Sequence, residues 1–236
     1  MTTAKQIVAE LKTLGNESYK KTLLKHGAKE PFFGVKIEDL KKIQKRIKKD
    51  YELALELYDT GISDAMYLAG LIADEEQMTK KDLQKWIEGA SWNMISEYTV
   101  PWVAAESPHG RELALKWIDS KEEKIAAAGW STLGSLVSIK PDEELDLAEL
   151  KRLLARVEKT IHSERNCVRG TMNAFVIAVG CAIAPLSDLA MTTAKRIGEV
   201  SVDMGDTACQ VPFAPAYIDK VKKRGTIGKK RKTARC

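Results

Sequence analysis

The sequence has few cysteines, prolines and aromatic residues, and each shortage excludes a class of protein. Its 236 residues include 4 cysteines and 7 prolines, and 6% of them are aromatic. Four scattered cysteines without a Cys-x-x-Cys pair exclude a disulfide scaffold and argue against a zinc knuckle. They favour a reducing compartment, so we expect the cytoplasm. The share of hydrophobic residues, 44%, is enough for a buried core and excludes a collagen-like or disordered chain.

Long hydrophobic runs are also missing. The longest nearly unbroken apolar run covers residues 174–186, a stretch that contains Gly180 and Pro185. A membrane-spanning helix needs about 20 apolar residues, so we interpret this run as a buried core helix and expect no membrane partner. The first residues show helical periodicity without an apolar signal core.

The local signatures of common enzyme classes are absent. His26, His109 and His162 lie far apart and show no metal-ligand spacing, so no metal site is expected. The chain contains no nucleophile elbow, no P-loop and no dinucleotide-binding glycine pattern. We therefore expect no cofactor.

Apolar residues recur at helical spacing along almost the whole chain. One stripe comprises Leu53, Ala54, Leu57 and Tyr58, and similar stripes begin at Ile7, Leu68, Leu83, Leu113 and Leu150. This pattern predicts an all-α protein of roughly a dozen amphipathic helices. Short loops between them favour about six antiparallel pairs with roughly 40 residues each, which is the HEAT or armadillo range.

No linker rich in proline or serine divides the chain. We predict one domain over residues 1–219, an α-α superhelix of HEAT-like antiparallel helix pairs, followed by a basic C-terminal tail over residues 220–236. A compact, non-repetitive all-α domain is the alternative. Within the domain, Gly89 is expected to end one helix in the left-handed conformation, with Ser91 capping the next. Pro101 should kink or end the helix in which it lies.

The positive charge is concentrated at the C-terminal end. The net charge is +5, yet residues 220–236 hold nine basic and no acidic residues, and the rest has four more acidic residues than basic ones. Such a tail favours a polyanion, either nucleic acid or an anionic membrane surface. A solvated, disordered terminus is the alternative. The densest cluster is Lys229, Lys230, Arg231 and Lys232.

A second basic feature is the predicted helix over residues 37–49. Its apolar residues fall on one side, and Lys41, Lys42 and Lys45 lie on the other. Such a helix can bury one face and present the other to phosphates. An ordinary solvated lysine-rich face explains the pattern equally well.

Two further segments carry polar groups beside apolar ones. In residues 90–101, Asn93 and Glu97 share a helix face near Trp92, so Glu97 faces either a cleft or solvent with Trp92 in the core. In residues 163–173, Arg165 and Arg169 are one turn apart, and Asn173 follows one turn later. These three side chains either line a groove or pair with acidic neighbours.

Two short motifs carry a resemblance to a known family. Phe33-Gly34-Val35-Lys36 precedes the basic helix, and Ser91-Trp92 precedes Val100-Pro101. On an all-helical chain of this length, they resemble the DNA alkylation repair superfamily of AlkD-like proteins. The resemblance implies a HEAT-like superhelix whose concave basic surface holds the backbone of duplex DNA. In the active branch, that fold removes N3- or N7-alkylated purines.

The resemblance also implies where catalytic groups would stand. The active branch uses two tryptophans and an aspartate to stabilise positive charge on the sugar. At the matching positions this sequence has Asn93, Asn173 and Glu97, while Trp92 is the neighbour that packs. Because the expected groups are replaced, the chain looks more like the AlkF/AlkG branch, which binds DNA, including branched DNA, without excising bases.

We therefore expect a DNA-binding protein that holds the phosphate backbone in a basic groove. Its expected contacts are Lys41, Lys42, Lys45, Trp92, Asn93, Arg165, Arg169, Asn173, Lys229, Lys230, Arg231 and Lys232. One alternative is an alkylpurine DNA glycosylase in which the carboxylate of Glu97 stabilises the developing charge. The other is a HEAT-type scaffold that binds an acidic segment of another protein.

Overall fold

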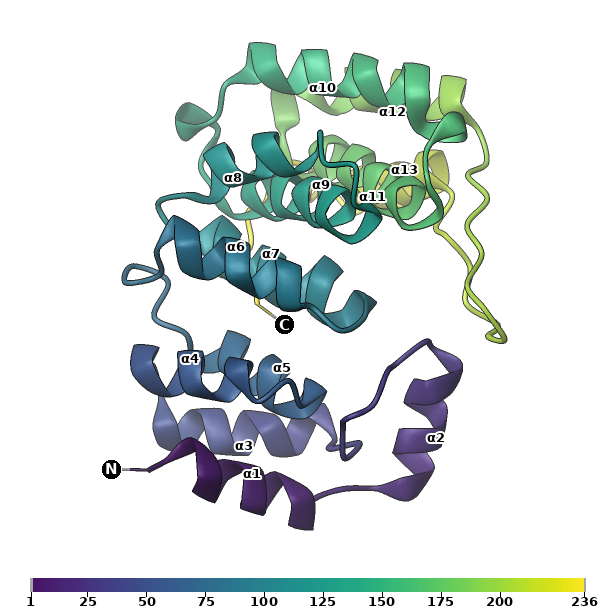
Figure 1. The fold of residues 1–236 in the computed structure, drawn as a ribbon. Helices are drawn as coiled ribbons and strands as arrows, with labels where there is room; N and C mark the ends of the chain where they lie inside the picture. The colour runs from purple at the N-terminus through teal and green to yellow at the C-terminus, as the bar shows by residue number, and fades with distance from the viewer. Residues whose placement is uncertain (1, 236) are drawn as a thin grey trace. The chain divides into compact units, whose positions relative to one another are not determined.

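The computed structural model describes residues 2–235, which form thirteen α-helices and no strand (Figure 1). The prediction of an all-α fold is confirmed. Contacts divide the chain into two compact units. Unit 1 comprises residues 2–109, 204–208 and 235, and unit 2 comprises residues 110–203 and 209–234.

Unit 1 is organised around one completely buried helix, α5 (Ser63–Ile72). All ten of its residues are buried, as expected for a helix that is apolar on every side. It contacts α3 and α4, and also a π-helical segment, Met94–Thr99. The other helices of unit 1 are α1 (Ala4–Thr13), α2 (Glu17–Lys25), α3 (Ile37–Ile47), α4 (Tyr51–Asp59), α6 (Lys80–Gly89) and α7 (Val100–Glu106).

Unit 2 is organised around α11 (Asn166–Ala182), which packs against α9, α10, α12 and α13. The apolar stripe of α10, including Leu150, Leu154 and Val157, is buried as its spacing predicts. Helix α11 contacts both the next helix, α12, and the one after it, α13, which is the pattern of stacked helix pairs. The other helices of unit 2 are α8 (Gly110–Trp117), α9 (Glu123–Ile139), α10 (Leu147–Thr160), α12 (Ser187–Ile197) and α13 (Ala214–Lys223).

Two glycines in α9 differ in how closely neighbouring atoms approach them. A Cβ atom on Gly129 would lie 2.6 Å from the backbone nitrogen of Ile118, so this glycine allows the end of α8 to approach α9. A Cβ atom on Gly134 would meet only ordinary contacts at 3.8 Å. Gly129 is therefore required by packing, whereas Gly134 is not.

The Phe33-Gly34-Val35 motif owes its conformation to the buried carboxylate of Asp64, near the N-terminus of α5. The backbone N–H of Phe33 donates to Oδ2 of Asp64 at 2.5 Å, and that of Val35 donates to Oδ1 at 2.8 Å. Gly34 between them has a φ of 75°, which favours glycine. The motif is thus a loop fastened to the first turn of the central helix, and it leads directly into α3.

The segment around Pro101 differs from its expected form. A π-helical turn precedes α7, and the N–H of Val100 donates to the carbonyl of Ile95, five residues back. Pro101 has no N–H and its ring disfavours a regular turn before it, which accounts for the wider turn. Helix α6 ends at Gly89 as expected, but the expected left-handed conformation is wrong, because Gly89 does not have a positive φ and Ala90 follows as the cap. Ser91 instead contacts the hydroxyl of Ser63 at 3.0 Å.

Parts of the basic C-terminal segment are bonded to the helices. The expected boundary at residue 219 lies inside α13. Beyond α13, the N–H of Gly228 donates to the carbonyl of Cys181 in α11 at 2.9 Å, and the N–H of Arg231 donates to the carbonyl of Ser138 in α9 at 2.8 Å. This segment is therefore held along unit 2.

Arg235 is counted with unit 1 and is largely buried there. Its guanidinium lies 2.7 Å from a carboxylate oxygen of Glu75 and 3.2 Å from one of Glu106. Burial raises the pKa of Glu75, but Lys49 and Arg235 outweigh that effect and hold the net pKa below its ordinary value. The paired carboxylate therefore stabilises unit 1 in its charged form.

Candidate nucleic-acid interface

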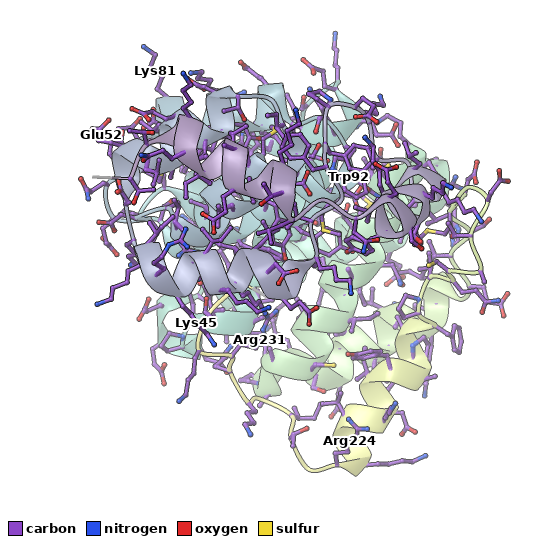
Figure 2. All side chains as sticks on the ribbon, turned by 90° about the horizontal axis from the view of Figure 1, so that it is seen from below. Lys45, Glu52, Lys81, Trp92, Arg224 and Arg231 are labelled. Carbon is purple, nitrogen blue, oxygen red and sulfur yellow. The ribbon has the colours of Figure 1, made fainter. Side chains whose placement is uncertain are left out.

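Helix α3 presents lysines opposite its buried face, as its pattern predicts. Leu40 and Ile43 are buried, whereas Lys45 is exposed and extends away from the helix (Figure 2). Lys42 forms an ion pair with Asp39 at 2.7 Å, and this hydrogen bond raises the pKa of Lys42. Lys41 is half-buried. Among residues 2–235, neither Lys41 nor Lys45 forms an ion pair, so their charges are available to an anionic ligand.

The π-helical segment separates the three candidate residues near it. Asn93 is exposed, Glu97 is half-buried, and Trp92 is half-buried against a pocket. Trp92 begins this turn, since its carbonyl accepts from the N–H groups of Ile95 and Ser96. Asn93 is therefore open to a ligand, whereas Trp92 packs, as expected.

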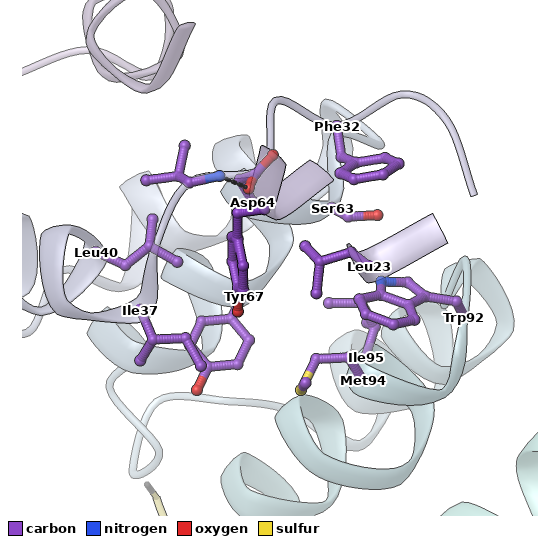
Figure 3. A pocket seen from close by; sticks show the side chains of 12 residues that line it. Leu23, Phe32, Ile37, Leu40, Ser63, Asp64, Tyr67, Trp92, Met94 and Ile95 are labelled. Carbon is purple, nitrogen blue, oxygen red and sulfur yellow. Dashed lines mark hydrogen bonds between the residues drawn. The ribbon is translucent and has the colours of Figure 1, made fainter. Parts of the chain in front are cut away.

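The pocket beside Trp92 is small and mostly apolar (Figure 3). Its walls include Leu23, Phe32, Tyr67 and Met94, and the ring edge that carries Nε1 of Trp92 faces it. Its volume is about 30 Å³, far below that of pockets that hold small-molecule ligands. It is too small for a nucleobase or a sugar.

The arginines at the start of α11 hold neighbouring backbone and side chains. The guanidinium of Arg165 donates to the carbonyls of Ser120 and Lys121, at 3.1 and 2.6 Å. That of Arg169 donates to the side-chain oxygen of Asn166 at 3.3 Å. Both arginines are half-buried. Part of their hydrogen-bonding capacity is therefore already used within unit 2.

Asn173 is buried, with 1% of its surface exposed. Its side-chain amide donates to the carbonyl of Pro212 at 2.9 Å. At the N-terminus of α11, the side chain of Asn166 both accepts from and donates to the backbone of Asp203. These two asparagines hold residues 203 and 212 of the segment that connects α12 with α13. Asn173 thus positions this loop.

The C-terminal basic cluster has one half-buried member, Lys230, and three exposed ones. The ammonium of Lys230 lies 2.8 Å from Asp142 and donates to the carbonyl of Val137 at 2.9 Å. Its positive charge is therefore partly neutralised within the protein. Lys229, Arg231 and Lys232 are exposed. Within the described range, Lys229 and Lys232 form no ion pair with a carboxylate. Figure 2 shows Arg231 on this segment.

The cluster lies along one edge of a groove in unit 2, between α11, α13 and residues 226–231. The groove has a volume of about 610 Å³. The sequence does not predict this groove, because the apolar run over residues 174–186 indicates a buried core helix, whereas several of its side chains line the groove. The residues that line it are Ser138, Ala174, Ile177, Ala178, Cys181, Ala182, Tyr217, Val221, Thr226, Lys229, Lys230 and Arg231.

The structure thus brings together only part of the expected contacts. Unit 1 holds the α3 lysines with Trp92, Asn93 and Glu97, whereas unit 2 holds Arg165, Arg169, Asn173 and the C-terminal cluster. In the described part of the chain, no three His, Cys, Asp or Glu side chains are placed to bind a metal ion. Over the same residues, no single helix is long and apolar enough to cross a membrane, and only the bent pair α11 and α12 passes that test together.

Comparison with known proteins identifies relatives over nearly the whole chain. A family model described as "DNA alkylation repair enzyme" matches residues 7–193. The uncharacterized proteins Lin0241 of Listeria innocua and Lmo0209 of Listeria monocytogenes are each 32% identical over 230 residues, which covers 95% of this chain and 99% of theirs.

A solved structure is similar along its full length. It is described as "A new family of proteins related to the HEAT-like repeat DNA glycosylases with affinity for branched DNA structures". It is 38% identical, with a TM-score of 0.92, and the match covers 100% of both chains. The expected HEAT-like helical fold is confirmed by this similarity.

Proposed function

This chain belongs to the DNA alkylation repair enzyme family, and on that premise we propose that it binds DNA, including branched DNA, mainly through the phosphate backbone. The observation that carries the proposal is its full-length similarity to a structure from proteins described as having affinity for branched DNA. Exposed lysines in both units support it, because lysine contacts to phosphates supply most of the sequence-independent affinity for DNA.

The proposed phosphate contacts are cations that are exposed or half-buried. In unit 1 they are the α3 lysines Lys41, Lys42 and Lys45, and in unit 2 they are the C-terminal cluster. Arg165 and Arg169 add positive charge while holding neighbouring groups. Trp92 and Asn173 contribute through positioning, since both pack within the protein, whereas Asn93 is exposed enough to contact DNA directly.

The first alternative function is excision of alkylated purines. Asn93 is exposed and Asn173 is buried against Pro212, so at these positions no aromatic pair is present to support Glu97. The loss of each cation–π contact removes about 0.5–2 kcal/mol of charge stabilisation. The second alternative function is a HEAT-type scaffold that binds an acidic segment of another protein.

The direct test measures fluorescence anisotropy with a linear duplex and with three-way and four-way junctions over a range of salt concentrations. We expect tighter binding to the junctions and a steep decrease with salt. The double variant Lys229→Ala/Lys232→Ala should weaken binding to all three and reduce the salt slope by about two. Lys151→Ala/Lys195→Ala removes the same charge from exposed positions on α10 and α12 and should have little effect.

Three results would redirect the proposal. Base release from methylated DNA that disappears in Glu97→Gln would establish a glycosylase. Binding that does not change with salt would contradict backbone recognition. No DNA binding, together with a protein partner that is retained after nuclease treatment, would favour a scaffold. We keep the cytoplasm as the proposed location, because four scattered cysteines without a Cys-x-x-Cys pair favour a reducing compartment.

A further inference from the structure

The groove between α11, α13 and residues 226–231 combines three kinds of surface. Its floor on α11 is made of small or apolar side chains, including Ala174, Ile177 and Ala178. The ring of Tyr217 on α13 borders it and is 47% exposed. Basic residues of the C-terminal cluster line its other edge. At about 610 Å³ it falls within the range of pockets that hold small organic groups.

The electrostatics of the groove favour an anionic ligand. Lys230 is paired with Asp142, but Lys229 is exposed and has no carboxylate partner among the described residues. Arg231 is exposed at the same edge. An anion with an apolar or aromatic body would therefore meet positive charge at the rim and an apolar floor below it.

We propose that this groove binds an unpaired nucleotide of DNA. Its base lies over the α11 floor and stacks against Tyr217, and its phosphates meet Lys229 and Arg231. Proteins that bind single strands combine these two elements, an aromatic platform for bases and a cationic track for the backbone. The inference rests on the proposed DNA binding and adds to it a site for one particular form of DNA.

Stacking on Tyr217 would let the groove distinguish unpaired nucleotides from those in a continuous duplex. In a continuous duplex each base is already stacked between its neighbours, so it can reach an aromatic side chain only after costly unstacking. An unpaired nucleotide at a gap, a flap or a branch point can reach the aromatic ring with little of this unstacking free energy. The groove would thus favour branched or interrupted DNA over a plain duplex.

The test uses the full chain and three variants. Tyr217→Ala removes the stacking ring, and Ala174→Trp places a bulky side chain in the groove from an exposed position on α11. Phe213→Ala is the matched control, because Phe213 is 48% exposed in the same unit and does not line the groove. The probes are a plain duplex and the same duplex interrupted by a single-stranded gap that contains 2-aminopurine.

We expect the gapped probe to bind more tightly than the duplex and its 2-aminopurine fluorescence to be quenched on binding. Tyr217→Ala and Ala174→Trp should each weaken gap binding by about tenfold and abolish the quenching. Both variants should bind the plain duplex like the wild type, and Phe213→Ala should bind both probes like the wild type. Circular dichroism confirms that each variant is folded.

The other outcomes separate this inference from the proposed function. Equal binding of gapped and plain duplex by the wild type, or equal losses on both probes in the variants, overturns the nucleotide site and leaves DNA binding intact. The same loss in Phe213→Ala also overturns it. Binding to neither probe overturns both proposals, and capture of an acidic peptide or anionic vesicles in the groove would then identify its occupant.

Discussion

Replacement of Asp64 by alanine provides the sharpest test of how unit 1 is held together. Asp64 is 6% exposed, and its two carboxylate oxygens accept the N–H groups of Phe33 and Val35. Alanine would leave both donors without this partner in a loop packed against α5. The loop that carries α3 and its lysines would lose its attachment.

The expected size of the effect follows from these two hydrogen bonds. Removing the partner of a buried donor costs about 1–3 kcal/mol, and more when the lost partner is charged. Phe33 is only half-buried, so water can recover part of the loss at one donor. We expect Asp64→Ala to lower the free energy of unfolding by about 3 kcal/mol, which lowers Tm by about 6–12 °C in a chain of this size.

The assay is thermal and urea unfolding followed by circular dichroism. Asp64→Asn, which keeps one carbonyl oxygen as an acceptor, should lose less than Asp64→Ala. Asp59→Ala is the control, since Asp59 is half exposed and its ion pair with Lys85 is worth about 0–1 kcal/mol. If Asp64→Ala costs no more than Asp59→Ala, the carboxylate does not hold the loop and the reasoning is wrong.

Three further predictions follow from contacts described above. Gly129→Ala should lower the free energy of unfolding by about 1–3 kcal/mol, because the new Cβ atom would collide with the backbone of Ile118. Gly134→Ala should leave it unchanged or raise it by up to about 1 kcal/mol. Urea titrations of both variants measure the difference. Asn173→Ala should cost about 1–2 kcal/mol and speed limited proteolysis of the loop between α12 and α13, as mass spectrometry of the fragments would show. Because the pKa of Glu75 is lowered in the folded state, its stabilising contribution is present above pH 4.5 and is lost as the pH falls through the folded pKa. Acid titration should therefore show a smaller loss of stability in Glu75→Gln than in the wild type over that window.

The helical fold could be predicted from sequence because burial repeats with the helical period. The stripe on α10 and the two faces of α3 followed directly from spacing. The π-helical turn could not be predicted in the same way, because it depends on Pro101 and on close packing against α5. A Cβ atom on Gly70 of α5 would lie 2.3 Å from the side chain of Thr99, so the two segments are in tight contact.

The candidate site was less predictable, since its details depend on distant partners. Arg165 donates to carbonyls 44 and 45 residues away, and Asn173 donates to one 39 residues away. Neither contact leaves a local pattern in the chain. The groove was missed for a different reason, because the small side chains Ala174 and Ala178 count as apolar in a sequence pattern yet leave open space in the fold.

The two asparagine anchors on α11 have a consequence for how this protein can evolve. Asn166 holds Asp203 and Asn173 holds Pro212, so one helix, α11, fixes residues 203 and 212 of the segment between α12 and α13. Insertions or deletions between these two points need not shift either flanking helix. We therefore expect homologous chains to vary most in length here, and new surface chemistry can be acquired at this position without redesign of the core.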